Sequence, residues 1–173
     1  MQNILSLETV TWDCFGKMSP IAKRELMYAG SFGLAGLLCG VVFIKRNSGA
    51  KAGQDMNRIM NELKKEKTKL WVFPEGTRRN TGEIHQFKKG AFHSAIQAQV
   101  PIVPVVFSSY KSFLNADNKI FNDGEVIVEA LPAIPTTGMT VQDVDKLIEM
   151  TKTAMIEAYD RNSSEVAQRA IAM

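Results

Sequence analysis

The stretch Leu70-Trp71-Val72-Phe73-Pro74-Glu75-Gly76-Thr77-Arg78 determines how the rest of the chain is interpreted. Its first four residues are apolar, and their aromatic and β-branched side chains favour a buried strand. Pro74 ends that strand, because proline has no backbone N–H to give to a sheet. The strand therefore delivers the polar residues after Pro74 to one edge of the predicted sheet.

Predicted strands and helices alternate on both sides of this stretch. We expect strands over Met18–Ala22, Gly40–Lys45, Lys69–Phe73, Ile102–Phe107 and Glu125–Ala130, and helices over Glu25–Leu38, Ala50–Lys67, Ala91–Gln99 and from Thr140 onward. Such alternation predicts an α/β fold, with a mostly parallel central sheet flanked by helices. In these folds ligands gather beyond the carboxyl ends of the strands, which directs attention to the loop after Phe73.

The composition is that of one ordinary globular domain of 173 residues, with 45% hydrophobic and 23% charged residues. A net charge of +3 fits an anionic metabolite or an acidic lipid surface, and the chain carries no nucleic-acid-binding motif. Cys14 and Cys39 belong to no C-x-x-C pair, so we expect neither a disulfide framework nor a metal site. This cysteine usage suits a reducing compartment or the cytosolic side of a membrane.

The segment Leu26–Ile44 is uncharged and reaches the lower length limit of a membrane-spanning helix. Glycines punctuate it at positions 30, 33, 36 and 40, and its last residues resemble a strand. We therefore predict a buried helix, ended near Gly40 and followed by a central strand, and rank a membrane span second. The glycines are expected to allow close helix packing. Met1–Asp13 shows no secretory signal pattern.

The last predicted helix begins with a Thr140-x-x-Asp143 capping box. An apolar stripe that includes Val144 and Leu147 is expected to face the core. We predict one domain over residues 1–160 and a loosely held C-terminal tail over residues 161–173.

The loop after Phe73 has the residue types of a phosphate site. Gly76 lets a ligand approach the backbone, Thr77 offers a hydroxyl, and Arg78 offers a planar cation that grips phosphate oxygens in pairs. Glu75 is suited to orient the arginine or to accept from a ligand hydroxyl. Phe87-Lys88-Lys89-Gly90 brings further cations to a helix start, where backbone N–H groups favour an anion. The plainer alternative is a solvated basic loop.

Five blocks in order resemble the glycerophospholipid acyltransferases, and most of all the animal 1-acylglycerol-3-phosphate acyltransferases. Phe73 to Arg78 resembles the family's FPEGTR element, and Phe87 to Phe92 its F-K-K/R-G-A-F element. The other blocks are Ala22-Lys23-Arg24-Glu25-Leu26, Gly40 to Arg46, in which Lys45 stands where Asp is usual, and Val100 to Val105. The resemblance runs from about Ser19 to about Tyr159.

This resemblance implies acyl transfer from acyl-CoA to the 2-hydroxyl of lysophosphatidic acid, giving phosphatidic acid. It implies acceptor binding by Glu75, Gly76, Thr77, Arg78, Lys88 and Gly90. It also implies acyl-CoA as co-substrate without another cofactor, contact with a membrane surface, and a place at the endoplasmic reticulum membrane.

The family's catalytic His-x-x-x-x-Asp motif is absent. At the usual spacing the histidine would fall at about Met1 and the aspartate at about Ser6, so no catalytic residue is assigned. His85 and His93 lack a carboxylate at the right spacing and are poor replacements. Two explanations stay open: N-terminal truncation, or a member that binds lipid phosphate without catalysing. A generic α/β phosphate-binding module is a third, more remote, alternative.

Overall fold

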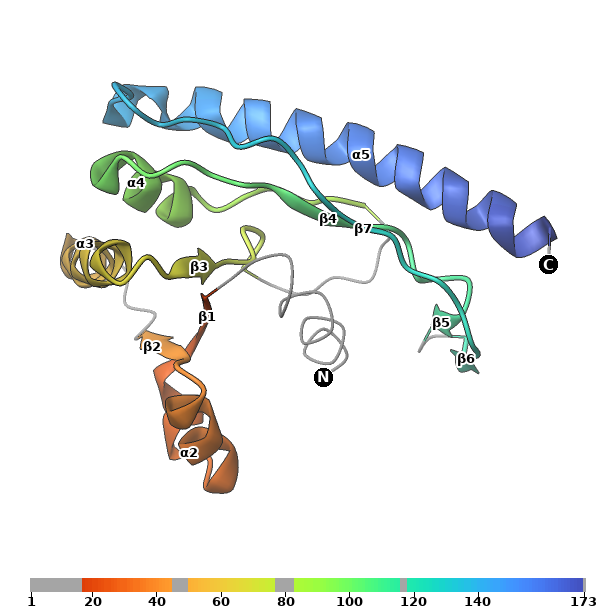
Figure 1. Cartoon of the computed structure of the whole chain (residues 1–173), viewed down its shortest axis with the longest axis horizontal. Helices are drawn as coiled ribbons and strands as arrows, with labels where there is room; N and C mark the ends of the chain where they lie inside the picture. The colour runs from red at the N-terminus through yellow and green to blue at the C-terminus, as the bar shows by residue number, and fades with distance from the viewer. Residues whose placement is uncertain (1–16, 45–49, 77–82, 116–117, 173) are drawn as a thin grey trace.

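A computed structural model describes residues 17–44, 50–76, 83–115 and 118–172 (Figure 1). A parallel sheet contains β1 (Met18–Lys23), β2 (Val42–Ile44) and β3 (Lys69–Trp71) in the order β2-β1-β3. Ile21 pairs with Val42, and Pro20 with Trp71. The predicted α/β fold is confirmed. The Gly40–Lys45 region, however, supplies an edge strand of this sheet, and the centre belongs to β1.

The predicted amphipathic helix between the second and third strands is α3 (Ala50–Lys65). It ends as Lys67 adopts a left-handed φ of 53° and the Thr68 N–H bonds to the Leu63 carbonyl. This geometry turns the chain directly into β3. The predicted helix over Ala50–Lys67 is therefore confirmed, and its observed end at Lys65 lies two residues before the predicted one.

The second half of the described chain adds α4 (Lys89–Ala98) and an antiparallel pair, β4 (Val105–Phe107) with β7 (Val128–Ala130). The predicted strand from Ile102 is interrupted at Pro104: Ile102 forms an isolated bridge with Ile134 before β4 begins. A short hairpin of β5 (Leu114–Asn115) and β6 (Ile120–Phe121) was not predicted.

The main buried core lies between α4 and the final helix. Phe87, Phe92, Ile96, Val144 and Leu147 form its buried cluster. The Phe87 and Phe92 rings are stacked with centroids 6.0 Å apart. This core fixes the start of α4, which is the second of the two predicted phosphate-binding elements, against the body of the protein.

The last helix begins at the predicted capping box. Thr140 and Asp143 exchange the two capping bonds around a short 3-10 turn, η2 (Val141–Asp143), and α5 (Val144–Ala172) follows. The expected loosely held tail is wrong, because α5 continues through the predicted boundary at residue 160. Val166 is buried, and Ser163 Oγ accepts a 2.9 Å bond from the Ser109 N–H.

The Leu26–Ile44 segment is a compact hairpin rather than one helix and a strand. It consists of η1 (Arg24–Tyr28), a turn at Gly30 with φ 58°, α2 (Ser31–Leu38) and β2. Gly40, with φ 73°, closes α2 through bonds from Gly40 N–H to Leu37 O and from Val41 N–H to Gly36 O. The predicted helix end near Gly40 is therefore confirmed.

Two glycines inside the hairpin hold its parts in close contact, as predicted. A Cβ on Gly33 would stand 2.0 Å from the Met27 carbonyl oxygen, so α2 packs directly on the backbone of η1. A Cβ on Gly36 would stand 2.9 Å from the Phe43 ring, so α2 also packs on β2. Larger side chains at either position would separate these elements.

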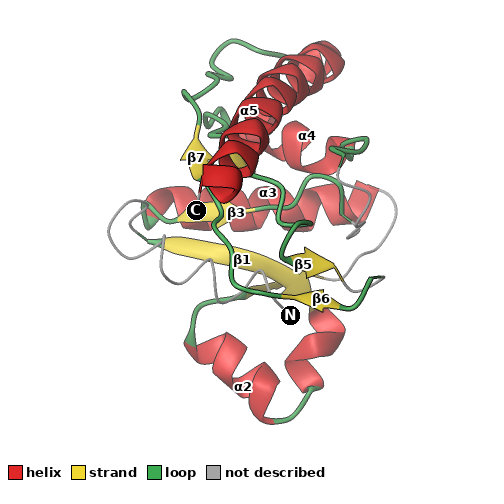
Figure 2. Ribbon diagram, turned by 90° about the vertical axis from the view of Figure 1, so that its right-hand side faces the viewer, coloured by secondary structure: helices red, strands yellow, loops and turns green. Residues whose placement is uncertain are grey.

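The predicted burial of this helix is wrong. Of the residues in α2 only Gly33 is buried, while Phe32, Leu34, Leu37 and Leu38 are exposed. Figure 2 shows α2 on the side of β1 away from α3, α4 and α5. Among the helices of the described ranges, none has both the length and the apolar character needed to cross a bilayer.

Candidate functional site

A tight turn follows the carboxyl end of β3. The Gly76 N–H donates a 3.1 Å hydrogen bond to the Phe73 carbonyl oxygen, which closes a four-residue turn through Pro74 and Glu75. Gly76 has a φ of 65°, in the left-handed region where glycine is favoured. The sequence places this glycine here because only a residue without Cβ adopts that geometry without strain.

The start of α4 lies directly against this turn. The Lys88 N–H donates a 2.8 Å bond to the Pro74 carbonyl oxygen. The Lys88 side chain lies over Gly76, close enough that an added Cβ would meet its Cδ, Cε and Nζ atoms at 2.9 Å. The structure therefore brings together two elements that the sequence treats as one site, although Lys88 lies twelve positions after Gly76.

Glu75 links the turn to the segment before α4. Its Oε2 atom accepts a 3.3 Å hydrogen bond from the His85 backbone N–H. The sequence suggests that Glu75 orients an arginine or meets a ligand hydroxyl, and it gives no sign of this backbone partner. Thr77 and Arg78, the other two predicted binding residues of the loop, lie outside the described residues.

The two lysines at the start of α4 have different surroundings. Lys89 forms an exposed ion pair with Asp145 at 2.6 Å, which ties α4 to α5. Lys88, the N-terminal cap residue of α4, lies over the turn instead. Gly90 is exposed, and nothing lies within 4 Å of where its Cβ would be. Lys88 is therefore the lysine of this pair that faces the candidate site.

The electrostatics of the site favour an anion. Lys88 places its ammonium group against Gly76, and the first turn of a ten-residue helix begins one residue later. The N–H groups of a helix start carry a partial positive charge, to which the lysine adds a full one. The arrangement can bind a phosphate or carboxylate group of a ligand.

No catalytic dyad is visible in the part of the chain that the structure describes. His93 lies in α4, and His85 lies beside Glu75 through its backbone. The Met1 and Ser6 positions, where the family motif would fall, lie outside the described residues. Among the described side chains, no group of three or more histidines, cysteines and carboxylates is arranged to hold a metal ion.

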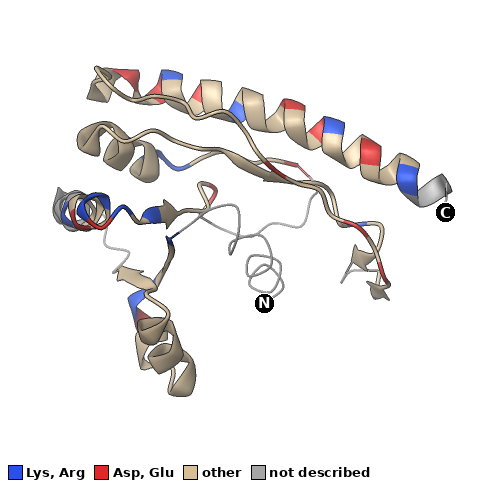
Figure 3. Ribbon diagram, in the orientation of Figure 1, with Lys and Arg blue, Asp and Glu red and all other residues tan. Residues whose placement is uncertain are grey.

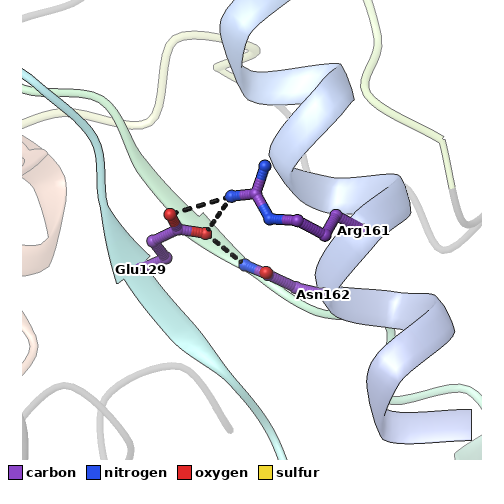
Figure 4. A network of polar contacts seen from close by, with 3 residues as sticks. All are labelled: Glu129, Arg161 and Asn162. Carbon is purple, nitrogen blue, oxygen red and sulfur yellow. Dashed lines mark hydrogen bonds and ion pairs between the residues drawn. The ribbon is translucent and has the colours of Figure 1, made fainter. Parts of the chain in front are cut away.

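A second polar cluster lies away from the turn. Glu129 on β7 accepts hydrogen bonds from Arg161 at 2.6 and 2.8 Å and from Asn162 at 2.8 Å, both on α5 (Figure 4). The hydrogen bonds from Asn162 and then Arg161 hold the pKa of Glu129 below its ordinary value. Sequence reasoning missed this cluster, because Arg161 and Asn162 were assigned to a loose tail.

An open groove of about 560 Å³ borders this cluster. Its walls come from the segment 129–135, from Pro104 and from residues of α5 between Met150 and Arg161. Neither Gly76 nor Lys88 lines it. The groove and the candidate phosphate site are therefore separate features of the described surface.

Comparisons with known proteins agree with the fold and the motifs. The sequence profile of the family described as Acyltransferase matches residues 4–108. The human 1-acyl-sn-glycerol-3-phosphate acyltransferase alpha is 44% identical over 150 residues, which cover 87% of this chain and 53% of the human protein. The human beta protein is 48% identical over 135 residues, or 78% of this chain and 49% of that protein. The chain thus spans about half the length of these curated relatives.

A solved structure supports the same architecture. The 1-acyl-sn-glycerophosphate (LPA) acyltransferase PlsC from Thermotoga maritima superposes with a TM-score of 0.58 at 23% sequence identity. The superposition covers 81% of this chain and 56% of that protein. At this identity the likeness concerns the fold alone, while the profile match extends over more than half of the sequence. The chain therefore belongs to the acyltransferase family.

Proposed function

We propose that this chain serves acyl transfer from acyl-CoA to the 2-hydroxyl of lysophosphatidic acid, and that its own part in the reaction is to bind the acceptor phosphate. The observation that carries the proposal is the contact between the Gly76 turn and Lys88 at the start of α4. The names of the relatives, which are acyltransferases of 1-acyl-sn-glycerol-3-phosphate, support the choice of acceptor.

Each proposed binding residue has a physical role. Gly76 has no Cβ, so the Lys88 side chain lies directly against the turn and supplies a point charge there. Gly90 keeps the first turn of α4 free of side-chain bulk on its exposed side. In this proposal Thr77 adds a hydroxyl donor and Arg78 a bidentate guanidinium, one and two residues after Gly76. Glu75 holds the turn in place through the His85 N–H.

In the proposed reaction the acceptor's 2-hydroxyl oxygen forms a bond to the thioester carbonyl carbon of acyl-CoA. The hydroxyl proton passes to a general base, and the C–S bond breaks to release the CoA thiol. The resemblance assigns the base to a histidine with an aspartate five residues on. This sequence has neither residue at the expected positions, Met1 and Ser6. No other cofactor enters the reaction.

Ser6 stands where the family motif has its aspartate, and this departure supports a second candidate function, lipid-phosphate binding without catalysis. Both candidates use the same phosphate site, and both place the protein at a membrane surface. Because the relatives act on a lipid substrate, we propose that this surface is the endoplasmic reticulum membrane. We also propose residues 1–160 as the acyltransferase domain, with the second half of α5 as its continuous extension.

Calorimetric titration with a short-chain lysophosphatidic acid, kept below its critical micelle concentration, tests the phosphate site. The matching monoacylglycerol, which lacks the phosphate, is the ligand control. We expect the phosphate form to bind more tightly, and Lys88→Ala to weaken it about three- to tenfold, as removal of one partly exposed charge predicts.

Lys89→Ala is the matched control variant. It removes the same charge one residue away, but Lys89 pairs with Asp145 rather than lying over Gly76. We expect it to leave affinity almost unchanged. Equal binding of both ligands by the parent chain, or equal losses in the two lysine variants, would refute a phosphate site at this turn.

A further inference from the structure

The hairpin formed by η1 and α2 leaves large apolar side chains in contact with solvent. Tyr28 is 72% exposed, Phe32 55%, Leu34 60% and Leu38 81%. Exposed apolar residues occur singly on most proteins, but here they are concentrated in eleven consecutive residues. Such a surface is costly in water and calls for an apolar partner.

The exposed apolar side chains project from more than one side of α2, outside the face on which Gly33 and Gly36 pack against η1 and β2. With 3.6 residues per turn, Phe32 and Leu34 point about 200° apart around the helix axis. Leu37 points in a direction between these two, and Leu38 points in a direction beyond that of Leu34. A helix that docks on a protein needs only one apolar face, whereas a helix with exposed apolar side chains on several sides needs an apolar environment around all of them. Hydrocarbon chains of a lipid bilayer provide such an environment.

The charges of the hairpin are concentrated where it joins the sheet. Figure 3 shows α2 without acidic or basic residues, and charged residues only at the attached end of the hairpin. These are the exposed residues Lys23, Arg24 and Glu25, with a net charge of +1. Long cationic side chains at the base of an inserted segment reach the phosphate level of the headgroups.

The size of the hairpin decides between spanning and partial insertion. An eight-residue helix is about 12 Å long, and the hydrocarbon core of a bilayer is about 30 Å thick. The helix therefore enters about one leaflet. Hydrogen bonds from the Ala29 and Gly40 N–H groups close the chain before and after α2, which reduces the number of backbone groups that insertion would leave unpaired.

We infer that η1 and α2 insert into one leaflet of a lipid bilayer, with Lys23 and Arg24 at the level of anionic headgroups. The inference does not depend on acyl transfer or on the phosphate site. It assigns the membrane contact to a specific element of this chain and gives it a depth of about one leaflet.

Vesicle flotation of the full chain tests the inference. Vesicles of phosphatidylcholine alone and of phosphatidylcholine mixed with phosphatidylglycerol contain no lysophosphatidic acid, so the result is separate from acceptor binding. We expect the double variant Leu34→Ser, Leu38→Ser to bind both vesicles at least about tenfold more weakly, because two exposed leucines lose their transfer to hydrocarbon. Both side chains lie outside the core, so unfolding midpoints should match the parent.

Phe121→Ser is the matched control. Phe121 is 83% exposed and lies in the β5–β6 hairpin, so this variant also removes a large exposed apolar side chain. We expect its vesicle binding to equal that of the parent. The double variant Lys23→Gln, Arg24→Gln should lose affinity only for the anionic vesicles, and this loss should diminish with added salt.

Depth is read from the exposed Ser31, the first residue of α2, next to the Gly30 turn. A dye on Ser31→Cys, with both native cysteines replaced, should be quenched by lipids that carry a quencher on the acyl chain. The same dye at Gln97→Cys on α4, with both native cysteines replaced, should not be quenched. The inference is overturned if the parent chain does not float, if Leu34→Ser, Leu38→Ser floats like the parent, or if these leucines affect only self-association in ultracentrifugation.

Discussion

The Lys88 side chain lies across the Cα atom of Gly76, with its Cδ, Cε and Nζ atoms 2.9 Å from the place where a Cβ would be. The contact joins the turn after β3 to the residue before α4, and the Lys88 N–H bond to the Pro74 carbonyl supports it. The Lys88 charge is thus held against the turn that follows β3.

Gly76→Ala is expected to destabilise the protein by about 1–2 kcal/mol, the usual cost of a left-handed conformation in a residue with Cβ. The φ of 65° cannot relax without breaking the bond from Gly76 N–H to Phe73 O, while the flexible Lys88 end can move aside. Urea unfolding monitored by tryptophan fluorescence measures the change. Gly90→Ala, in open space on α4, should instead be neutral or stabilising by up to about 1 kcal/mol.

Arg78→Ala is expected to weaken lysophosphatidic acid binding roughly ten- to a hundredfold, as the loss of a charge-assisted contact of about 1.5–3 kcal/mol predicts. Arg78→Lys should recover only part of the affinity, because the two-pronged geometry is lost. Binding is measured by calorimetry with monoacylglycerol as control. If Arg78→Ala bound both ligands like the parent, the Gly76-Thr77-Arg78 segment would be a structural turn only.

The 173-residue chain by itself is expected to show little or no acyl transfer. General acid–base catalysis contributes roughly 10²- to 10⁴-fold in rate, and the histidine that would supply it is absent from the sequence. Purified chain is assayed with lysophosphatidic acid and oleoyl-CoA, beside an intact member of the family. Turnover comparable to that member would contradict the expectation and would require a base elsewhere in the chain.

The Glu129 cluster predicts a specific acid sensitivity. The pKa of Glu129 in the folded protein lies below its ordinary value of 4.5, because Asn162 and Arg161 bond to the carboxylate. Its contribution to stability is therefore complete above pH 4.5 and is lost as the pH falls through the folded-state value. Glu129→Gln should be less stable than the parent at neutral pH, and the difference should shrink on acidification. Unfolding midpoints measured from neutral pH down to about pH 3 decide this, and a difference independent of pH would contradict it.

The sequence could predict those helices, strands and caps whose residue pattern lies within a few neighbouring positions. The amphipathic residues of α3, the apolar run of β3 and the Thr140–Asp143 capping box each carry their signal within a few neighbouring positions. The contact between the Gly76 turn and Lys88 was also predictable. In parallel sheets, the loops that bind ligands lie together beyond the carboxyl ends of the strands.

The features that sequence could not predict depend on distant contacts. Whether the apolar α2 is buried is decided by what lies around it, and an apolar pattern alone favours burial. The helix after Tyr159 is polar, yet Ser163 and Asn162 bond to Ser109 and Glu129, more than thirty residues earlier. The central position of β1 likewise follows from strand order, which local patterns do not specify.

The hairpin that contains α2 is attached at both ends to neighbouring strands of one sheet. It leaves β1 at Lys23, which pairs with Ile44, and returns into β2 at Val42, which pairs with Ile21. Because both attachments are to adjacent paired strands, and α2 packs on Phe43 of β2 through Gly36, we expect the hairpin and the sheet to tilt together. The Gly76 turn leaves β3 at the same carboxyl edge at which β1 gives way to the hairpin. The sheet therefore fixes the distance between the hairpin and the Gly76 turn. A surface that binds the hairpin would also determine how far from that surface the turn binds its ligand.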